Sequence, residues 1–262
     1  MEKYDYFEKL DHNPYEDLIW NIPEQKTGTV AVIGGNSQSF ATIAKVSEHL
    51  TSRFPLKTIR TVLPDKLKSK LPPLPDLFFM PSTDSGSFAK SDQLIETASD
   101  SGFTILLGDF SKNSATAIAI TELIKRTDNP ITITRDAVDL ICSDANDFIE
   151  RENVCYVATL SQLQKLFRAV YYPKVLLLSM PITQLAEALH KFTLSYPTTI
   201  VTFHVGQIVV AAKGQVISVP ITNTNYSQLT IWQGQLASNI ATLNFYNPNQ
   251  PLESTVAALF YQ

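Results

Sequence analysis

Two kinds of residue in this sequence could do chemistry, and both stand directly after predicted strands. The turn Gly34-Gly35-Asn36 follows an apolar run and precedes a predicted helix, where free backbone N–H groups can bind a phosphate. A plain tight turn is the alternative. Asp109 and Asp136 each follow a later strand, and either carboxylate could act as a general base or simply support a helix N-terminus. We therefore expect any reactive site at the carboxyl ends of the strands.

Other catalytic and metal-binding patterns are missing from the sequence. It contains no GxGxxG, P-loop or GxSxG motif. Cys142 and Cys155 form no CxxC pair, so we expect two reduced thiols and no disulfide framework. The histidines are His12, His49, His190 and His204. None has a metal-ligand spacing to another histidine, a carboxylate or a thiol, and we predict no metal site.

The composition excludes some classes of protein. The chain has 262 residues and a net charge of −4, which argues against non-specific electrostatic binding of nucleic acid. Its 9 glycines are about half the usual share of roughly 7%, so few positions can bind phosphate through bare backbone. The first residues lack the apolar core of a signal peptide, and no stretch resembles a membrane span. We expect a cytoplasmic globular protein.

Predicted strands alternate with predicted helices over most of the chain, which is typical of βαβ units and a mostly parallel sheet. After residue 198 three strands follow one another so closely that they can pair only antiparallel. The predicted strands are 29–33, 57–63, 77–80, 104–107, 131–134, 154–157, 174–179, 199–203, 207–211 and 216–219. The predicted helices are 40–50, 91–99, 113–125, one starting at Asp136, 161–170, 182–194, 229–243 and 252–261.

No repeat or low-complexity linker divides the chain. We expect one domain, residues 28–262, with residues 1–27 as an N-terminal arm packed on the domain. One segment is unusual, because residues 214–252 contain no Asp, Glu, Lys or Arg. This composition predicts either a neutral ligand cleft or partner surface, or a buried C-terminal helix pair with amide-rich loops.

Four segments carry a resemblance to a known family. Residues 29–36 form a strand that ends in Gly-Gly-Asn, and residues 58–64 form a second strand that ends in proline. Residues 107–114 contain a Gly-Asp turn before a helix, and residues 130–138 form a strand followed by Asp-Ala. In this order they resemble the ADP-dependent NAD(P)H-hydrate dehydratases, a carbohydrate-kinase-related family of the ribokinase-like superfamily, over residues 28–258. The resemblance implies a ribokinase-like three-layer α/β/α sandwich with a mostly parallel central sheet and an antiparallel edge near the C-terminus.

The catalytic motifs of that family are not kept. Its Thr-Pro-His-Pro-Gly-Glu would fall on residues 157–162, which contain neither the His nor the Glu. Its Lys-Gly-Ala-x-Thr would fall on residues 203–207, which lack the Lys. Its Gly-Thr-Gly-Asp would fall near Ile231 and Trp232, and Gly234 stands in the place of the aspartate base. Because the bulky side chains of Ile231 and Trp232 stand where the family has a glycine-rich turn that leaves its backbone N–H groups open, we expect phosphate binding in the family manner to be abolished.

The resemblance implies ADP- or ATP-dependent dehydration of NAD(P)H-hydrate, with ADP or ATP as cofactor. The missing motifs predict that this activity is impaired or lost. The alternatives are a non-catalytic ligand-binding or oligomeric scaffold protein with the same fold and, third, a small-molecule kinase with a relocated base. We predict a homo-oligomer, no nucleic-acid or membrane partner, and an NAD(P)H-hydrate or nucleotide as ligand. The candidate ligand-contacting residues are Gly34, Gly35, Asn36, Thr42, Ser111, Thr159, Asn223, Asn225, Gln233 and Gly234.

Overall fold

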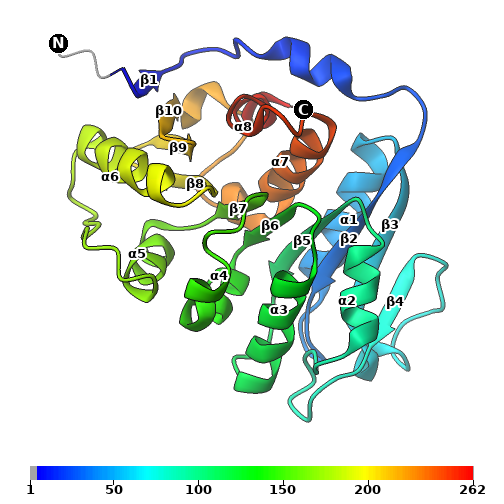
Figure 1. Cartoon of the computed structure of the whole chain (residues 1–262). Coiled ribbons are helices and arrows are strands. Elements are labelled where there is room, and N and C mark those ends of the chain that lie inside the picture. The colour runs from blue at the N-terminus through cyan, green and yellow to red at the C-terminus, as the bar shows by residue number, and fades with distance from the viewer. Residues whose placement is uncertain (1–4, 262) are drawn as a thin grey trace.

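A sheet of ten strands forms the centre of the computed structural model, which describes residues 5–261 (Figure 1). The strands are β1 (Phe7–Lys9), β2 (Thr27–Gly34), β3 (Leu56–Pro64), β4 (Leu77–Met80), β5 (Phe103–Gly108), β6 (Ile131–Thr134), β7 (Val154–Val157), β8 (Thr199–His204), β9 (Gln207–Ala212) and β10 (Gln215–Pro220). Their order is β1-β10-β9-β8-β7-β6-β5-β2-β3-β4. Only the pairs of β9 with β8 and with β10 are antiparallel among these strands. The predicted mostly parallel sheet with an antiparallel edge near the C-terminus is confirmed.

The central strands are apolar at successive positions, so both faces of the sheet must be covered by helices. In β2, Val30 and Val32 are buried toward one face of the sheet, and Ala31 and Ile33 toward the other. Such a strand is stable only where helices cover both sides of the sheet. The short turn at Gly206, where φ is +73°, joins β8 to β9 and requires their antiparallel pairing.

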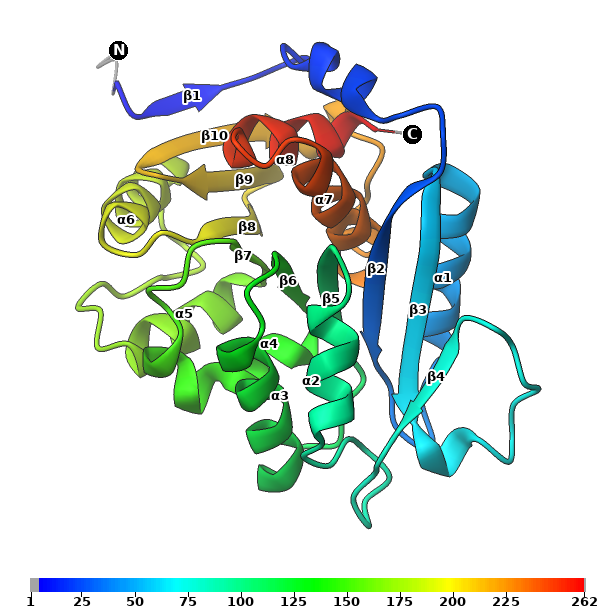
Figure 2. The same cartoon turned by 45° about the vertical axis from the view of Figure 1, so that its right-hand side comes forward.

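Helices cover both faces of the sheet and give three layers (Figures 1 and 2). They are α1 (Ala41–Arg53), α2 (Asp92–Ser99), α3 (Ser114–Arg126), α4 (Asp136–Ile141), α5 (Leu160–Ala169), α6 (Ile182–Ser195), α7 (Gln235–Tyr246) and α8 (Pro251–Phe260). Helices α2 to α6 pack on one face, and α1, α7 and α8 pack on the other. Between residues 5 and 261 no helix combines the length and apolar character needed to cross a membrane.

Part of the charge-free segment forms a buried helix, and a second buried helix follows at its end. Helix α7 is buried continuously from Leu236 to Leu243, and α8 is buried from Ser254 to Leu259. A helix that is buried on all sides has no solvated face on which a charged side chain could lie. The burial of α7 therefore accounts for the absence of charge from residues 236–243, whereas nearly all of α8 lies beyond the charge-free segment and carries Glu253.

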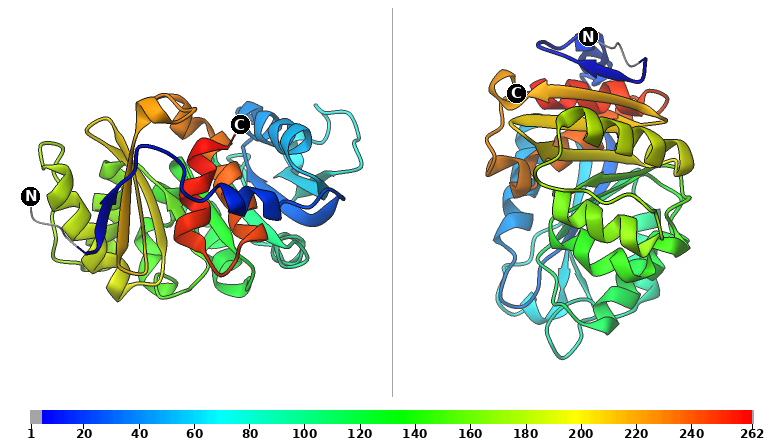
Figure 3. Two further views of the ribbon diagram at one scale, coloured as in Figure 1. Left: turned by 90° about the horizontal axis from the view of Figure 1, so that it is seen from above. Right: turned by 90° about the vertical axis from the view of Figure 1, so that its left-hand side faces the viewer.

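The N-terminal segment runs along the molecule and adds the last strand of the sheet. Phe7 lies opposite Val216, and β1 pairs with β10 in parallel. In Figure 3 (left) this dark-blue segment crosses over the gold strands and passes beside α8. A hydrogen bond of 2.6 Å from Asn21 Nδ2 to Asn247 Oδ1 fastens its 3₁₀ helix to the end of α7. The boundary between an arm of residues 1–27 and a domain of residues 28–262 stays a prediction, and residues 1–4 and 262 lie outside the described residues.

Two element predictions are wrong. Residues 174–179 form no strand, because within this run only Leu176 is buried, and the neighbouring strands pair with each other without it. The predicted helix 229–243 is interrupted at Gly234, whose φ of +93° ends a 3₁₀ helix (Thr230–Gln233) before α7 begins. The strand β1 was not predicted, since it is only three residues long and its partner is distant in the sequence.

Candidate functional site

The carboxyl ends of β2 and β5 meet at the point where the chain reverses its direction of progress through the sheet. From β2 the chain crosses through α1 to β3 on one side, and α2 later brings it back to β5 on the other side. In open α/β sheets ligands bind at such a switch point. The predicted residues Gly34 and Asp109 both lie here, at or just after the ends of these strands.

The two strands approach so closely that the glycines at their ends are needed for space. A Cβ atom on Gly34 would lie 2.6 Å from the carbonyl oxygen of Gly108. On Gly108, where φ is +83°, a Cβ atom would lie 2.0 Å from Asp136 Oδ1. These glycines therefore serve the close approach of backbone and carboxylate.

The turn after β2 uses its own N–H groups inside the protein. The N–H of Gly35 donates to the Gly108 carbonyl at 2.8 Å, and that of Ser37 to the Gly86 carbonyl at 2.8 Å. Asn36 Oδ1 accepts from the N–H groups of residues 38 and 39, and the Asn36 N–H donates to the Ser39 carbonyl. All five N–H groups of residues 35–39 thus have acceptors, which favours the plain tight turn over a phosphate cradle.

An ion pair links the ends of β5 and β6. Arg135 Nη2 lies 2.7 Å from Asp109 Oδ1, and the side chains are 25% and 14% exposed. Arg135 Nη1 also donates to the Trp232 carbonyl at 3.0 Å, so the guanidinium bridges to the segment before α7. Asp109 Oδ2 and Arg135 Nε are buried without a partner among the described residues.

Both members of this ion pair have strained backbone. Their φ angles, +56° for Asp109 and +58° for Arg135, lie in the region that favours glycine. Such conformations persist only where the surroundings impose them, and they gather at functional sites. Arg135 was not among the residues predicted from the sequence. The signal that could have pointed to it is a charged residue directly after a β-branched strand, in a chain with only 18% charged residues.

Asp136 holds the turn after β5 in place. Its Oδ1 accepts a hydrogen bond of 2.6 Å from the N–H of Asp109. Burial raises the pKa of the Asp136 carboxyl above its ordinary value; the Asp109 carboxylate adds to this, whereas that hydrogen bond and the Arg135 charge act against it. The two predicted carboxylates therefore do lie together, with Asp136 supporting the backbone of Asp109.

As the pH rises, the Asp136→Asn variant should gain stability relative to the wild-type protein. Because the folded pKa is raised, the stability contributed by Asp136 is present below its unfolded pKa and is lost as the pH rises through the folded pKa. The asparagine keeps the acceptor for the Asp109 N–H and does not ionise. We expect the difference in unfolding free energy, variant minus wild type, to increase in urea titrations from roughly pH 3 to pH 7. A difference that falls over this range would contradict the assignment.

The remaining predicted residues are spread along the same side of the fold, and several have structural partners. Thr159 forms a capping box with Gln162 at the start of α5, and Gln162 Nε2 donates to the Arg135 carbonyl at 2.7 Å. Gly234 caps α7 with a left-handed φ, and a Cβ atom there would lie 3.8 Å from the methyl group of Thr42. Ser111 donates to the Ser85 carbonyl, Asn223 to that of Asp11 and Asn225 to that of Phe260, whereas Gln233 is exposed before α7.

The carboxylate of Asp139, next to Gln162, forms an ion pair with Lys165. Burial acts to raise the pKa of Asp139, but hydrogen bonds from Lys165 and Gln162 outweigh it and lower the pKa. Within residues 5–261 no three histidine, cysteine, aspartate or glutamate side chains gather as a metal site would require.

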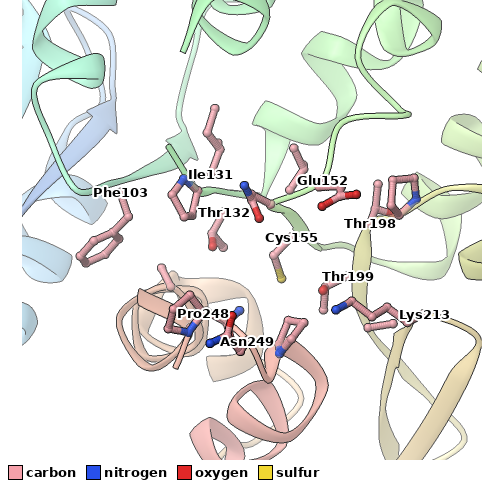
Figure 4. Close-up of a pocket in the computed structure, with 18 residues that line it drawn as sticks. Phe103, Ile131, Thr132, Glu152, Cys155, Thr198, Thr199, Lys213, Pro248 and Asn249 are labelled. Atoms are coloured by element: carbon pink, nitrogen blue, oxygen red, sulfur yellow. The ribbon is translucent and has the colours of Figure 1, made fainter. Parts of the chain in front are cut away.

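A cavity of about 570 Å³ lies at the opposite end of the sheet (Figure 4). Phe103, Ile131 and Val154, the first residues of β5, β6 and β7, line it together with Pro248 and Asn249 of the α7–α8 connection. None of the predicted site residues lines this cavity. Positive φ angles occur at both places, since Asn153 and Lys213 of the cavity lining have them as well as Asp109 and Arg135. The partly buried ion pair and its two atoms without a partner in the described chain distinguish the carboxyl edge, and we assign the candidate site of the fold to that edge for this reason.

Comparison with known proteins identifies the fold. No family model matches the sequence, and no curated protein sequence is similar to it. A ribokinase-like superfamily protein from Enterococcus faecalis V583 superposes with a TM-score of 0.65 at 14% identity, over 99% of this chain and 87% of that chain. A UPF0031 family member from Bacillus subtilis gives a TM-score of 0.59 at 15% identity, over 96% and 87%. The ADP/ATP-dependent NAD(P)H-hydrate dehydratase of Bacillus subtilis, crystallised with ATP and Mg²⁺, gives 0.58 at 15% identity, over 95% and 86%. The chain thus has the ribokinase-like fold.

Proposed function

We propose that this chain is a ribokinase-like protein, similar to the NAD(P)H-hydrate dehydratases, in which ADP- or ATP-dependent dehydration is strongly impaired or lost. One observation carries the proposal. At the N-terminus of α7, where the resemblance puts the anion hole and the base, the Trp232 carbonyl accepts a hydrogen bond from Arg135, and Gly234 offers no carboxylate.

The residues at this edge do not fit a nucleotide phosphate bound in the family manner. The Arg135 guanidinium is already engaged by Asp109 and by the Trp232 carbonyl, and the N–H groups of residues 35–39 donate within the protein. A single preorganised donor at a developing anion is worth about 3 kcal/mol in a transition state, so the loss of several would remove most of the catalysis. We therefore expect the fold to be kept without a comparable stabilisation of the reaction.

Similarity still suggests which ligands to test. The Bacillus subtilis dehydratase structure contains ATP and Mg²⁺, so ADP, ATP and an NAD(P)H-hydrate are the candidate ligands for this chain. Homo-oligomerisation and a cytoplasmic location stay predictions of the sequence.

Dehydration of NADPH-hydrate and calorimetry with ADP and ATP test the proposal. We expect no nucleotide-dependent dehydration and no nucleotide binding at millimolar concentration, with the Bacillus subtilis dehydratase as the positive control. Any residual rate should be unchanged by Asp136→Ala, because Asp136 supports the turn at Asp109 and has no reacting role. Micromolar nucleotide binding that NADPH competes would contradict the proposal, and so would a clear rate with ADP or ATP.

A further inference from the structure

We infer that the cavity at the amino ends of β5 to β8 is a binding site for a small uncharged polyhydroxyl molecule, a sugar or a nucleoside. Its volume of about 570 Å³ lies within the range of roughly 300–1,000 Å³ typical of small-molecule sites. The inference does not depend on the proposed function, because the cavity and the carboxyl edge lie at opposite ends of the strands.

The cavity results from a row of small polar side chains across three strands. Thr132 lies opposite Cys155, and Cys155 lies opposite Thr199, at the start of β6, β7 and β8. Two residues further along, on the same face, Val157 lies opposite Val201, and both pack in the core with α7 and α8. The smaller row leaves space between the strands and the α7–α8 connection, as Figure 4 shows for Thr132, Cys155, Pro248 and Asn249.

The lining offers hydrogen bonds that nothing in the described chain uses. Thr198 lines the cavity, is 1% exposed, and its hydroxyl has no partner among the described residues. Hydroxyls and the Asn249 amide both donate and accept, which matches the hydroxyl groups of a sugar ring. The proline rings in the lining, among them Pro248, provide apolar surface for the C–H faces of such a ring.

The charges around the cavity favour an uncharged ligand. Burial raises the pKa of Cys155 to about 12, so the thiol at its centre is neutral near pH 7. The charged residues of the lining, Glu152 and Lys213, are of opposite sign and exposed. A buried anion such as a phosphate would find no buried cation in this lining to offset its desolvation.

Binding of a panel of neutral and phosphorylated compounds tests this inference. The probes are glucose, galactose, maltose, adenosine and uridine, with glucose 6-phosphate and uridine monophosphate as charged counterparts, in saturation-transfer NMR followed by calorimetry. We expect at least one neutral compound to bind and its phosphorylated counterpart to bind at least about ten-fold more weakly. If no neutral compound binds at millimolar concentration, or if the phosphorylated form binds as tightly, the inference is wrong.

Matched variants locate the ligand. Thr199→Val removes a hydroxyl in the cavity at constant volume and should weaken binding about ten-fold. Thr202→Val is its control, because Thr202 is buried on the opposite face of β8, and it should leave the affinity unchanged. Asn249→Ala lies in an exposed connection, keeps the test valid if the strand variants fold poorly, and should also weaken binding. Full affinity in both Thr199→Val and Asn249→Ala, or loss of affinity in Arg135→Met, would place the ligand elsewhere and overturn the inference.

Discussion

Replacing Gly108 with alanine is expected to lower the unfolding free energy by about 3–4 kcal/mol, from overpacking and left-handed strain together. The new Cβ atom would lie 2.0 Å from Asp136 Oδ1 and 3.0 Å from the Ala137 backbone nitrogen. The carboxylate cannot move away without giving up its hydrogen bond to the Asp109 N–H. Urea denaturation at neutral pH measures the loss.

Gly206→Ala is the matched control for this substitution. Gly206 has a similar left-handed φ of +73°, but a Cβ atom there would meet nothing within 4 Å. Only backbone strain should remain, at about 1 kcal/mol. Equal losses of unfolding free energy in the two variants would show that the close contact between Gly108 and Asp136 leaves no cost for an added Cβ atom.

Arg135→Met is expected to destabilise the protein by about 2–3 kcal/mol, somewhat less than for a fully buried pair because the side chains are partly exposed. Asp109, which is 14% exposed, would keep its charge and lose its cationic partner. Methionine carries the same left-handed strain as arginine at this φ, so the difference reports the interaction of the charge and not the backbone.

A double variant and a surface pair separate the charge from other effects. Adding Asp109→Asn to Arg135→Met removes the unpaired carboxylate and should recover about 1–2 kcal/mol, because asparagine tolerates a left-handed φ. Lys125→Met breaks the exposed ion pair with Asp147 and should leave the unfolding midpoint unchanged. No recovery in the double variant would mean that the Arg135 side chain acts through packing alone.

Local patterns predicted most of the fold because neighbouring residues determine these elements. The β-branched run at residues 29–33 and the helix that follows it required a crossover, and the closely spaced strands after residue 198 required antiparallel pairing. Residues 174–179 were assigned wrongly because periodicity cannot distinguish a short apolar run in a strand from one in a loop. The three-residue strand β1 was missed because its stability comes from β10, far along the chain.

The candidate site was predicted less completely than the fold. The position of Asp109 and Asp136 after strand ends predicted that they lie together at the carboxyl edge of the sheet, and the structure joins them there through a hydrogen bond. The sequence could not show that the N–H groups of residues 35–39 have internal acceptors, since these depend on side chains and on the loop at Gly86. Nor could it show that Arg135 adopts a φ of +58° and reaches the Trp232 carbonyl, because tertiary packing imposes both.

Because Phe7–Lys9 pairs with β10, one of the first segments to be synthesised can take its place in the sheet only after one of the last. The ribosome makes Phe7 long before Val216, so the N-terminal segment has no partner until almost the whole chain has emerged. Its docking then covers a strand whose backbone groups would otherwise be open to pairing with another molecule. Without this segment the outer edge of β10 would be unpaired, and an unpaired edge strand is a template for aggregation.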